Sequence, residues 1–271
     1  MHRVPAKPQS FIMTKEHRRY LEFANAVRRS GTIGLCYGPA GIGKTVSALR
    51  LSNWNTIAPE LDAIHWDDAE AKIAAICARS GTVFHTARVG AGWRQLRDEL
   101  GQDMYRFGCL VFHDVERRTG QKVRGASPVE LVVVDEAERL NGACLEWIRD
   151  EFDRNAMGLI LTGMPGIEKR LSRYPQLYSR VGFAHEYRPL QKEELVFVLQ
   201  RHWKKLGLEL DEDEFTDAQA IAAVVRVTGG NFRLLQRLFA QIERVMKINE
   251  LSSLTEDVIE AARSTLVIGA T

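Results

Sequence analysis

The sequence predicts an α/β fold in which a parallel sheet flanked by helices is followed by a small all-helical domain. Up to about residue 188, short apolar runs such as Leu131–Val134 alternate with segments of helical periodicity. This alternation is typical of right-handed βαβ crossovers. After Pro189 the periodic segments are all helical. We therefore expect an α/β domain over residues 1–188 and a helical domain over residues 189–271.

The first elements follow from local signals along the chain. Residues 1–13 contain two prolines and are expected to be frayed, whereas a helix is predicted between Thr14 and Gly31. Thr32–Tyr37 is an apolar run that is too short for a helix, so it is predicted to be a buried strand. A helix over residues 44–52 follows the loop after this strand.

The remaining elements continue the same alternation. A helix is predicted before Gly81, and residues 94–118 have helical periodicity that Gly101 and Gly108 are expected to interrupt. Further strands are predicted at Thr82–Thr86, Leu131–Val134 and Leu159–Leu161, with a helix through Leu145, Ile148 and Phe152 between the last two. The helical domain is expected to hold helices near 191–206, 217–228, 231–249 and 255–266.

Composition excludes several classes of protein. Hydrophobic residues make up 45% and charged residues 27% of the 271 residues, which is ordinary for a folded soluble domain. The net charge of +2 is too small to indicate nucleic-acid binding by itself. The four cysteines include no Cys-x-x-Cys pair and are interpreted as buried reduced thiols. Because no run of about 18 apolar residues is present, we expect a cytoplasmic protein without a membrane partner.

One segment matches the phosphate-binding loop in full and lies between a predicted strand and a predicted helix. Its glycines let backbone N–H groups turn toward phosphates, Lys44 can reach the β- and γ-phosphates of ATP, and Thr45 can bind Mg²⁺. We include the next residue, Val46, in the predicted nucleotide site. The loop residues are Gly38, Pro39, Ala40, Gly41, Ile42, Gly43, Lys44 and Thr45.

Two carboxylates end the strand Leu131–Val134. Asp135 and Glu136 follow it directly, at the strand end where ligands of open α/β sheets gather. Asp135 is predicted to hold Mg²⁺ through water, and Glu136 is predicted to polarise the attacking water. The pattern therefore favours a Mg²⁺-dependent hydrolase that splits ATP to ADP and phosphate.

The two motifs followed by a helical domain resemble the AAA+ ATPases. That resemblance implies three further catalytic residues. Thr162, in Leu161-Thr162-Gly163, matches the polar residue that senses the γ-phosphate, and Arg233, in Gly230-Asn231-Phe232-Arg233, matches the lid arginine that reaches back to the nucleotide. Arg180 is the positional match for an arginine finger that bridges subunits, with Arg173 as its competitor.

Three segments resemble the bacterial transposition regulators TnsC, TniB and MuB: Val134–Leu140, Leu161–Pro165 and Gln176–Arg180. This resemblance implies a homo-oligomer, a ring or a helical filament, that assembles with ATP on duplex DNA. Such an assembly marks a target and recruits or activates a transposase, while a targeting protein supplies the site. The alternatives are a secretion or cell-envelope ATPase like ExeA and a STAND-type nucleotide switch in signalling.

A DNA-binding role requires cations that neutralise phosphates. Arg88, Arg94 and Arg97 fall where related ATPases place DNA-facing loops and helices, and Lys122 and Arg124 form a second candidate cluster. No helix-turn-helix or zinc module is evident in the sequence. Duplex DNA is therefore expected to be bound without sequence specificity.

Overall fold

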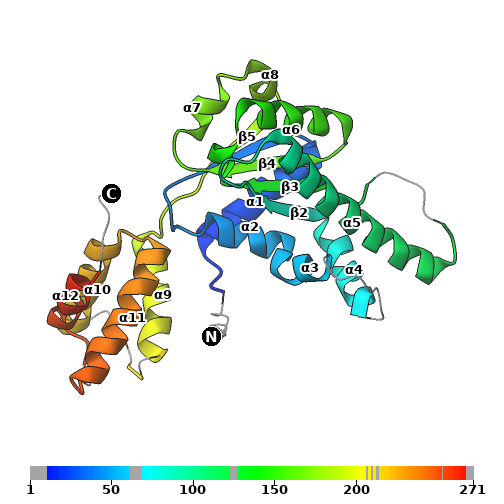
Figure 1. Ribbon diagram of the computed structural model, residues 1–271. Helices are drawn as coiled ribbons and strands as arrows, with labels where there is room; N and C mark the ends of the chain where they lie inside the picture. Colours follow the sequence, from blue (N-terminus) through cyan, green and yellow to red (C-terminus); the bar gives the residue numbers. More distant parts are fainter. Residues whose placement is uncertain are drawn as a thin grey trace. The chain divides into compact units, whose positions relative to one another are not determined.

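The computed structural model describes residues 11–61, 69–122, 127–205, 207–208, 210–211, 214–251 and 253–266. The chain divides into two compact units, and residues 19–188 form the larger one (Figure 1). The described residues before Arg19 group with the chain from Pro189 onward, which differs from the expected first domain of residues 1–188. The physical reason is at Lys15, whose N–H donates to Glu194 Oε1 over 2.7 Å.

The described part of the larger unit contains a five-stranded parallel sheet in the order β2-β3-β4-β1-β5. Four of the strands confirm the predicted runs to within two residues, and the fifth lies at the open edge beside β1. The strands are β1 (Ile33–Tyr37), β2 (Thr82–Thr86), β3 (Leu131–Asp135), β4 (Gly158–Gly163) and β5 (Val181–Glu186).

Helices cover both faces of the sheet because the strands carry apolar side chains on both faces. One face, with Cys36, Val133 and Ile160, packs against α1 and α2, and the other packs against α3 to α8. These helices are α1 (Lys15–Ser30), α2 (Lys44–Ser52), α3 (Trp54–Leu61), α4 (Ala69–Ser80), α5 (Trp93–Thr119), the 3-10 turn η1 (Ala137–Arg139), α6 (Gly142–Arg154), α7 (Ile167–Leu171) and α8 (Pro175–Tyr178).

The expected interruption of the helix at residues 94–118 is wrong. Helix α5 runs for 27 residues through Gly101 and Gly108 without a break. Its buried face, which includes Leu100, Phe107 and Val111, packs into the core of the sheet unit. This burial outweighs the helix penalty of about 1 kcal/mol for each glycine.

The second unit is helical, as predicted. Its helices are α9 (Lys192–Lys205), α10 (Phe215–Thr228), α11 (Phe232–Ile248) and α12 (Glu256–Ser264). They enclose a core of their own in which Trp203 is 1% exposed and Leu235, Leu238 and Ile242 are fully buried. None of the helices in the described ranges is long and apolar enough to cross a membrane.

The connection between the units is anchored at both ends by glycines. Tyr187 donates its N–H to Tyr37 O over 2.8 Å, and its own carbonyl lies so close to Gly38 that a Cβ there would be 2.3 Å away. Leu190 donates its N–H to Gly230 O over 3.1 Å, and a Cβ on Gly230 would lie 2.3 Å from Leu190 O. Both close approaches require glycine.

Candidate nucleotide-binding site

The predicted phosphate loop connects β1 to α2. Gly41 and Gly43 have φ angles of 79° and 113°, and Gly43 precedes the first turn of α2. Because these angles are accessible mainly to glycine, the loop can turn its backbone N–H groups toward the start of the helix. Ile42 is 1% exposed and packs into the core below the loop, so one apolar side chain fixes the loop to the sheet.

Lys44 is held inside this loop. Its side chain donates from Nζ to Gly38 O over 2.5 Å and to Pro39 O over 2.7 Å, and the residue is only 8% exposed. Burial lowers the pKa of Lys44, although the carboxylates of Asp135, Glu138 and Glu136 act in the opposite direction. The ammonium group therefore lies where its charge is poorly hydrated, which favours the approach of an anionic phosphate.

The two predicted Mg²⁺ ligands are in direct contact. Thr45 donates its hydroxyl to Asp135 Oδ2 over 2.6 Å, although the two residues are 90 positions apart. Asp135 is 3% exposed, and burial raises its pKa while the Thr45 hydroxyl and the Glu136 N–H lower it. A hydroxyl beside a buried carboxylate is the oxygen-rich pair that Mg²⁺ requires, so the residues present fit this ion.

Glu136 follows Asp135 with an unusual backbone conformation. Its φ of 55° and ψ of 39° are left-handed, which costs about 1 kcal/mol or more for a residue other than glycine. The side chain is partly exposed, and its Oε2 lies 3.5 Å from Arg139 Nη2. This conformation ends β3 abruptly and turns the chain into η1.

Glu138 is a third carboxylate of the site, and the sequence analysis assigned it no role. Its Oε2 is buried with no hydrogen-bond partner among the described residues. Burial is the main cause that raises the pKa of Glu138, and the neighbouring Glu136 contributes in the same direction. The spacing Asp135-Glu136-x-Glu138 was the signal that could have identified it.

The predicted γ-phosphate sensor, Thr162, is completely buried near the end of β4. In the sheet, Thr162 lies opposite Cys36 of β1. The residue before it, Leu161, lies opposite Val134 of β3. The Thr162 hydroxyl oxygen has no hydrogen-bond partner in the described part of the chain. Buried hydroxyl groups are normally paired, so an unpaired one near the carboxyl end of the central strand fits a site for a polar ligand.

Other loop positions differ in their exposure. Pro39 and Ala40 are exposed, and Val46, the second residue after Lys44, is 54% exposed although it is apolar. Below the loop, Tyr187 makes a hydroxyl contact of 2.8 Å with Ser47 of α2. This contact joins the loop helix to the connection between the units, and no sequence signal indicated it.

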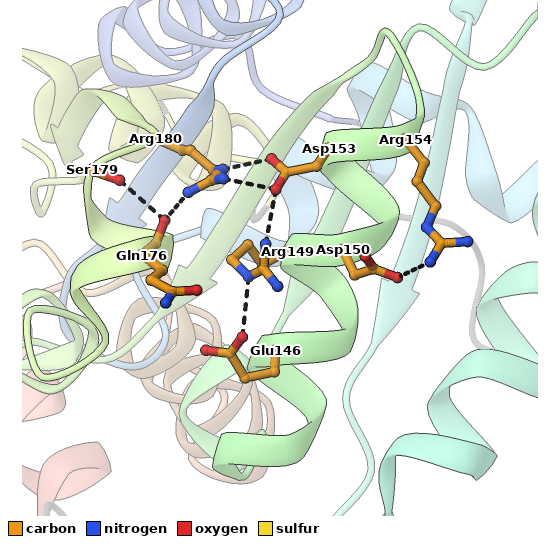
Figure 2. A network of polar contacts seen from close by, with 8 residues as sticks. All are labelled: Glu146, Arg149, Asp150, Asp153, Arg154, Gln176, Ser179 and Arg180. Atoms are coloured by element: carbon orange, nitrogen blue, oxygen red, sulfur yellow. Dashed lines mark hydrogen bonds and ion pairs between the residues drawn. The ribbon is translucent and has the colours of Figure 1, made fainter.

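The predicted arginine finger, Arg180, is bound within its own chain (Figure 2). Its Nε and Nη2 donate to the two carboxylate oxygens of Asp153 over 2.5 and 2.7 Å, and its Nη1 donates to Gln176 O. Asp153 also accepts from Arg149 over 2.9 Å, and its pKa is lowered chiefly by the hydrogen bond from Arg180. The competitor Arg173 is exposed and has no side-chain partner in the described ranges.

Arg233 lies in the other unit, in the first turn of α11. The side chain of Asn231 caps this helix by accepting from the N–H groups of Arg233 and Leu234 over 3.0 and 3.2 Å. The Arg233 side chain is exposed. Its contact with a nucleotide stays a prediction.

The candidate DNA-binding residues form separate groups. Arg88 lies 3.3 Å from Glu99, and the guanidinium carbons of Arg94 and Arg97 lie 5.3 and 5.5 Å from the ring centre of the exposed Trp93. These three arginines therefore gather near the start of α5. Lys122 follows its far end, about 40 Å away along a helix of this length. Arg124 lies outside the described residues.

Comparison with known proteins agrees with this geometry. A family model described as an AAA domain matches residues 27–171. The chain is 40% identical to a potential ATP-binding protein of Staphylococcus aureus, over 97% of this chain and 98% of that protein. It is 29% identical to the Mu-like prophage FluMu DNA transposition protein B of Haemophilus influenzae, over 53% of this chain and 52% of that protein.

Solved structures share the fold at low sequence identity. The RuvB Holliday junction branch migration motor of Thermotoga maritima aligns with a TM-score of 0.54 at 19% identity, covering 94% of this chain and 70% of that chain. The ADP form of the Aeropyrum pernix ORC2 protein also has a TM-score of 0.54, at 14% identity, covering 96% of this chain and 70% of that chain. The phosphate loop, the sheet order and the matched family model together show that this chain belongs to the AAA family of P-loop ATPases.

Proposed function

We propose that this chain is an ATP-dependent regulator of DNA transposition that oligomerises on duplex DNA, marks a target site and recruits or activates a transposase. The observation that carries this proposal is the similarity to a DNA transposition protein B, at 29% identity over 53% of the chain. The resemblance of three motifs to TnsC, TniB and MuB points in the same direction. In this proposal ATP hydrolysis controls assembly and disassembly in the cytoplasm.

The nucleotide site supplies the ATPase part of the function. Lys44 and the loop N–H groups bind the phosphates, and Thr45 and Asp135 hold Mg²⁺, which neutralises charge on the phosphates when bound. Glu136 orients and polarises the attacking water from its left-handed position after β3. The unpaired hydroxyl of Thr162 is available to the γ-phosphate, so its hydrogen bond would be lost once that phosphate leaves.

A finger from a neighbouring subunit is part of the proposed oligomer. Arg173 suits this role better than Arg180, because Arg173 is exposed and unpaired among the described residues whereas Arg180 is bound to Asp153. For the Arg180 side chain to reach a neighbouring subunit, its two hydrogen bonds to the Asp153 carboxylate would have to break. Arg233 is proposed to complete the site from the helical unit.

DNA binding in this proposal starts with the arginines near Trp93. The DNA phosphates would be contacted by Arg88, Arg94 and Arg97. The loop between Arg88 and Arg94 is also exposed to solvent, since Val89 is 81% exposed. Phosphate contacts carry no sequence information, so targeting requires a partner protein. Lys122 and Arg124 are proposed as a second, separate contribution.

The first experiment measures duplex-DNA binding and particle size without nucleotide, with ADP, and with a non-hydrolysable ATP analogue, at two salt concentrations. Rings or filaments on DNA that require the ATP analogue are expected. Nucleotide binding without DNA association at either salt concentration would refute the transposition role and favour a signalling switch or an envelope ATPase.

The Glu136→Gln variant tests hydrolysis in the same assay. It keeps the size of the side chain but removes the carboxylate, so ATP and Mg²⁺ binding should persist while turnover falls by about 10²-fold or more. Assemblies formed with ATP should then last longer than those of the unmodified protein. Normal turnover in this variant would show that Glu136 is not the catalytic carboxylate.

A further inference from the structure

A row of cations runs along the solvent side of α11 in the helical unit. Arg237, Arg244 and Lys247 are exposed and are spaced by seven and three residues, so they lie on one face of the helix. The opposite face holds the core residues Leu235, Leu238 and Ile242. We call the three cations the α11 basic face.

The α11 basic face lacks the ion pairs that other surface helices of this protein form. Arg226 of α10 contacts Glu256 and Glu260 of α12 over 2.8 and 3.0 Å, and Arg118 of α5 contacts Asp114 over 2.9 Å. No carboxylate of the described residues lies within ion-pair distance of Arg237, Arg244 or Lys247. The described residues therefore leave the charge on this face without a neutralising carboxylate.

Helix electrostatics do not explain the pattern. A cation in the last turn complements the helix dipole, which accounts for Lys247 but not for Arg237 or Arg244 farther toward the N-terminus. The first turn of α11 has no acidic residue and carries Arg233, the opposite of what the dipole favours. The only acidic residue of the helix is Glu243.

We propose that the α11 basic face binds the phosphate backbone of duplex DNA as a second contact surface, separate from the arginines near Trp93. This inference rests on the proposed DNA-binding function and assigns it to the helical unit as well. Arg237 and Lys247 are ten residues apart, or about 15 Å along the helix axis. A DNA strand presents several phosphates over that distance, at one per 3.4 Å of axial rise. The complementary charge, together with the lack of carboxylate partners in the described part of the chain, favours phosphate as the ligand.

The test compares two triple variants of the full-length chain. Arg237→Gln, Arg244→Gln and Lys247→Gln together remove three positive charges from the basic face. The matched control, Arg226→Gln, Arg263→Gln and Arg154→Gln, removes three arginines that are already paired with carboxylates. Binding to a fluorescent duplex of random sequence is measured by anisotropy with the ATP analogue, from 50 to 200 mM salt, after circular dichroism shows native helix content.

The basic-face variant is expected to lose affinity at least tenfold and to reduce the slope of log K against log salt by about 0.9 for each lost phosphate contact. The control should keep the slope of the unmodified protein. Equal slopes and affinities in the two variants would overturn the inference while leaving the proposed function intact. If the unmodified chain binds no duplex in any nucleotide state, the inference and the proposed function both fail. Should the triple variant not fold, Arg244→Gln alone must reduce the slope by about 0.9.

Discussion

Replacing Thr162 by valine should make the nucleotide-free protein more stable while it impairs the response to ATP. The Thr162 hydroxyl is fully buried and has no partner among the described residues. An unsatisfied buried hydroxyl costs about 1–3 kcal/mol, and valine has nearly the same shape without the polar atom. We expect the free energy of unfolding to rise by about 1–2 kcal/mol, which corresponds to roughly 2–8 °C in the unfolding temperature.

Thr82 provides a matched control in the same sheet. It is also 0% exposed in a strand, but its hydroxyl donates to Ser80 O over 2.7 Å and accepts from Arg28 Nη2 over 2.6 Å. Thr82→Val should therefore destabilise the protein by about 1–3 kcal/mol, because it breaks both bonds and leaves the half-buried guanidinium of Arg28 without one of its acceptors.

Thermal unfolding followed by circular dichroism, with and without ATP analogue and Mg²⁺, measures both effects. If Thr162 binds the γ-phosphate, the stabilisation by the analogue should shrink by about 1.5–3 kcal/mol in Thr162→Val. A Thr162→Val protein that is less stable than the unmodified protein without nucleotide, or that changes in parallel with Thr82→Val, would refute the reasoning.

Three further predictions concern the site and its connection. Burial raises the pKa of Asp135 in the folded state above that in the unfolded chain. Between these two pKa values the folded state binds more protons, so stability falls as the pH rises from the unfolded pKa through the folded one. Asp135→Asn should raise the nucleotide-free unfolding temperature at pH 7 by about 2–4 °C and abolish the Mg²⁺ dependence of ATP binding; a drop in that temperature would contradict this. Arg173→Ala should lower hydrolysis by assembled protein by about 10³-fold or more with unchanged unfolding, whereas Arg180→Ala should lower the unfolding temperature, and the reverse pattern would assign the finger to Arg180. Gly229 and Gly230 both have a positive φ, which costs an alanine about 1 kcal/mol at either position. Only a Cβ at Gly230 would also meet a carbonyl oxygen, that of Leu190, so urea unfolding should show at least twice the loss of stability for Gly230→Ala as for Gly229→Ala.

The fold could be predicted largely because its strands are short apolar runs with clear boundaries, and the phosphate loop because its pattern fixes both residue type and spacing. The continuity of α5 through Gly101 and Gly108 could not be predicted, because core packing rather than local propensity decides it. One helix was expected between residues 61 and 77, whereas the structure has α4 over much of that range and α3 before it. Residues 62–68 lie outside the described part.

Contacts between distant residues explain the remaining differences at the site. Arg180 forms its ion pair with Asp153, which is 27 positions away, and no sequence pattern in either segment indicates this pair. The spacing of Glu138 from Asp135 and Glu136 is visible in the sequence, but the burial of its carboxylate depends on neighbours in space. The grouping of residues 11–18 with the helical unit depends on contacts between Lys15 and the carboxylates of Glu193 and Glu194.

The segment that connects the two units has few freely rotating backbone bonds. Tyr187 is fixed against the phosphate loop and Leu190 against the Gly229–Gly230 turn that precedes Arg233, so only Arg188 and Pro189 lie between the anchors. The ring of Pro189 fixes its φ, and it also keeps Arg188 out of the helical region. Few rotatable bonds remain between Tyr187 and Leu190, so this segment has little conformational entropy to lose when the protein folds.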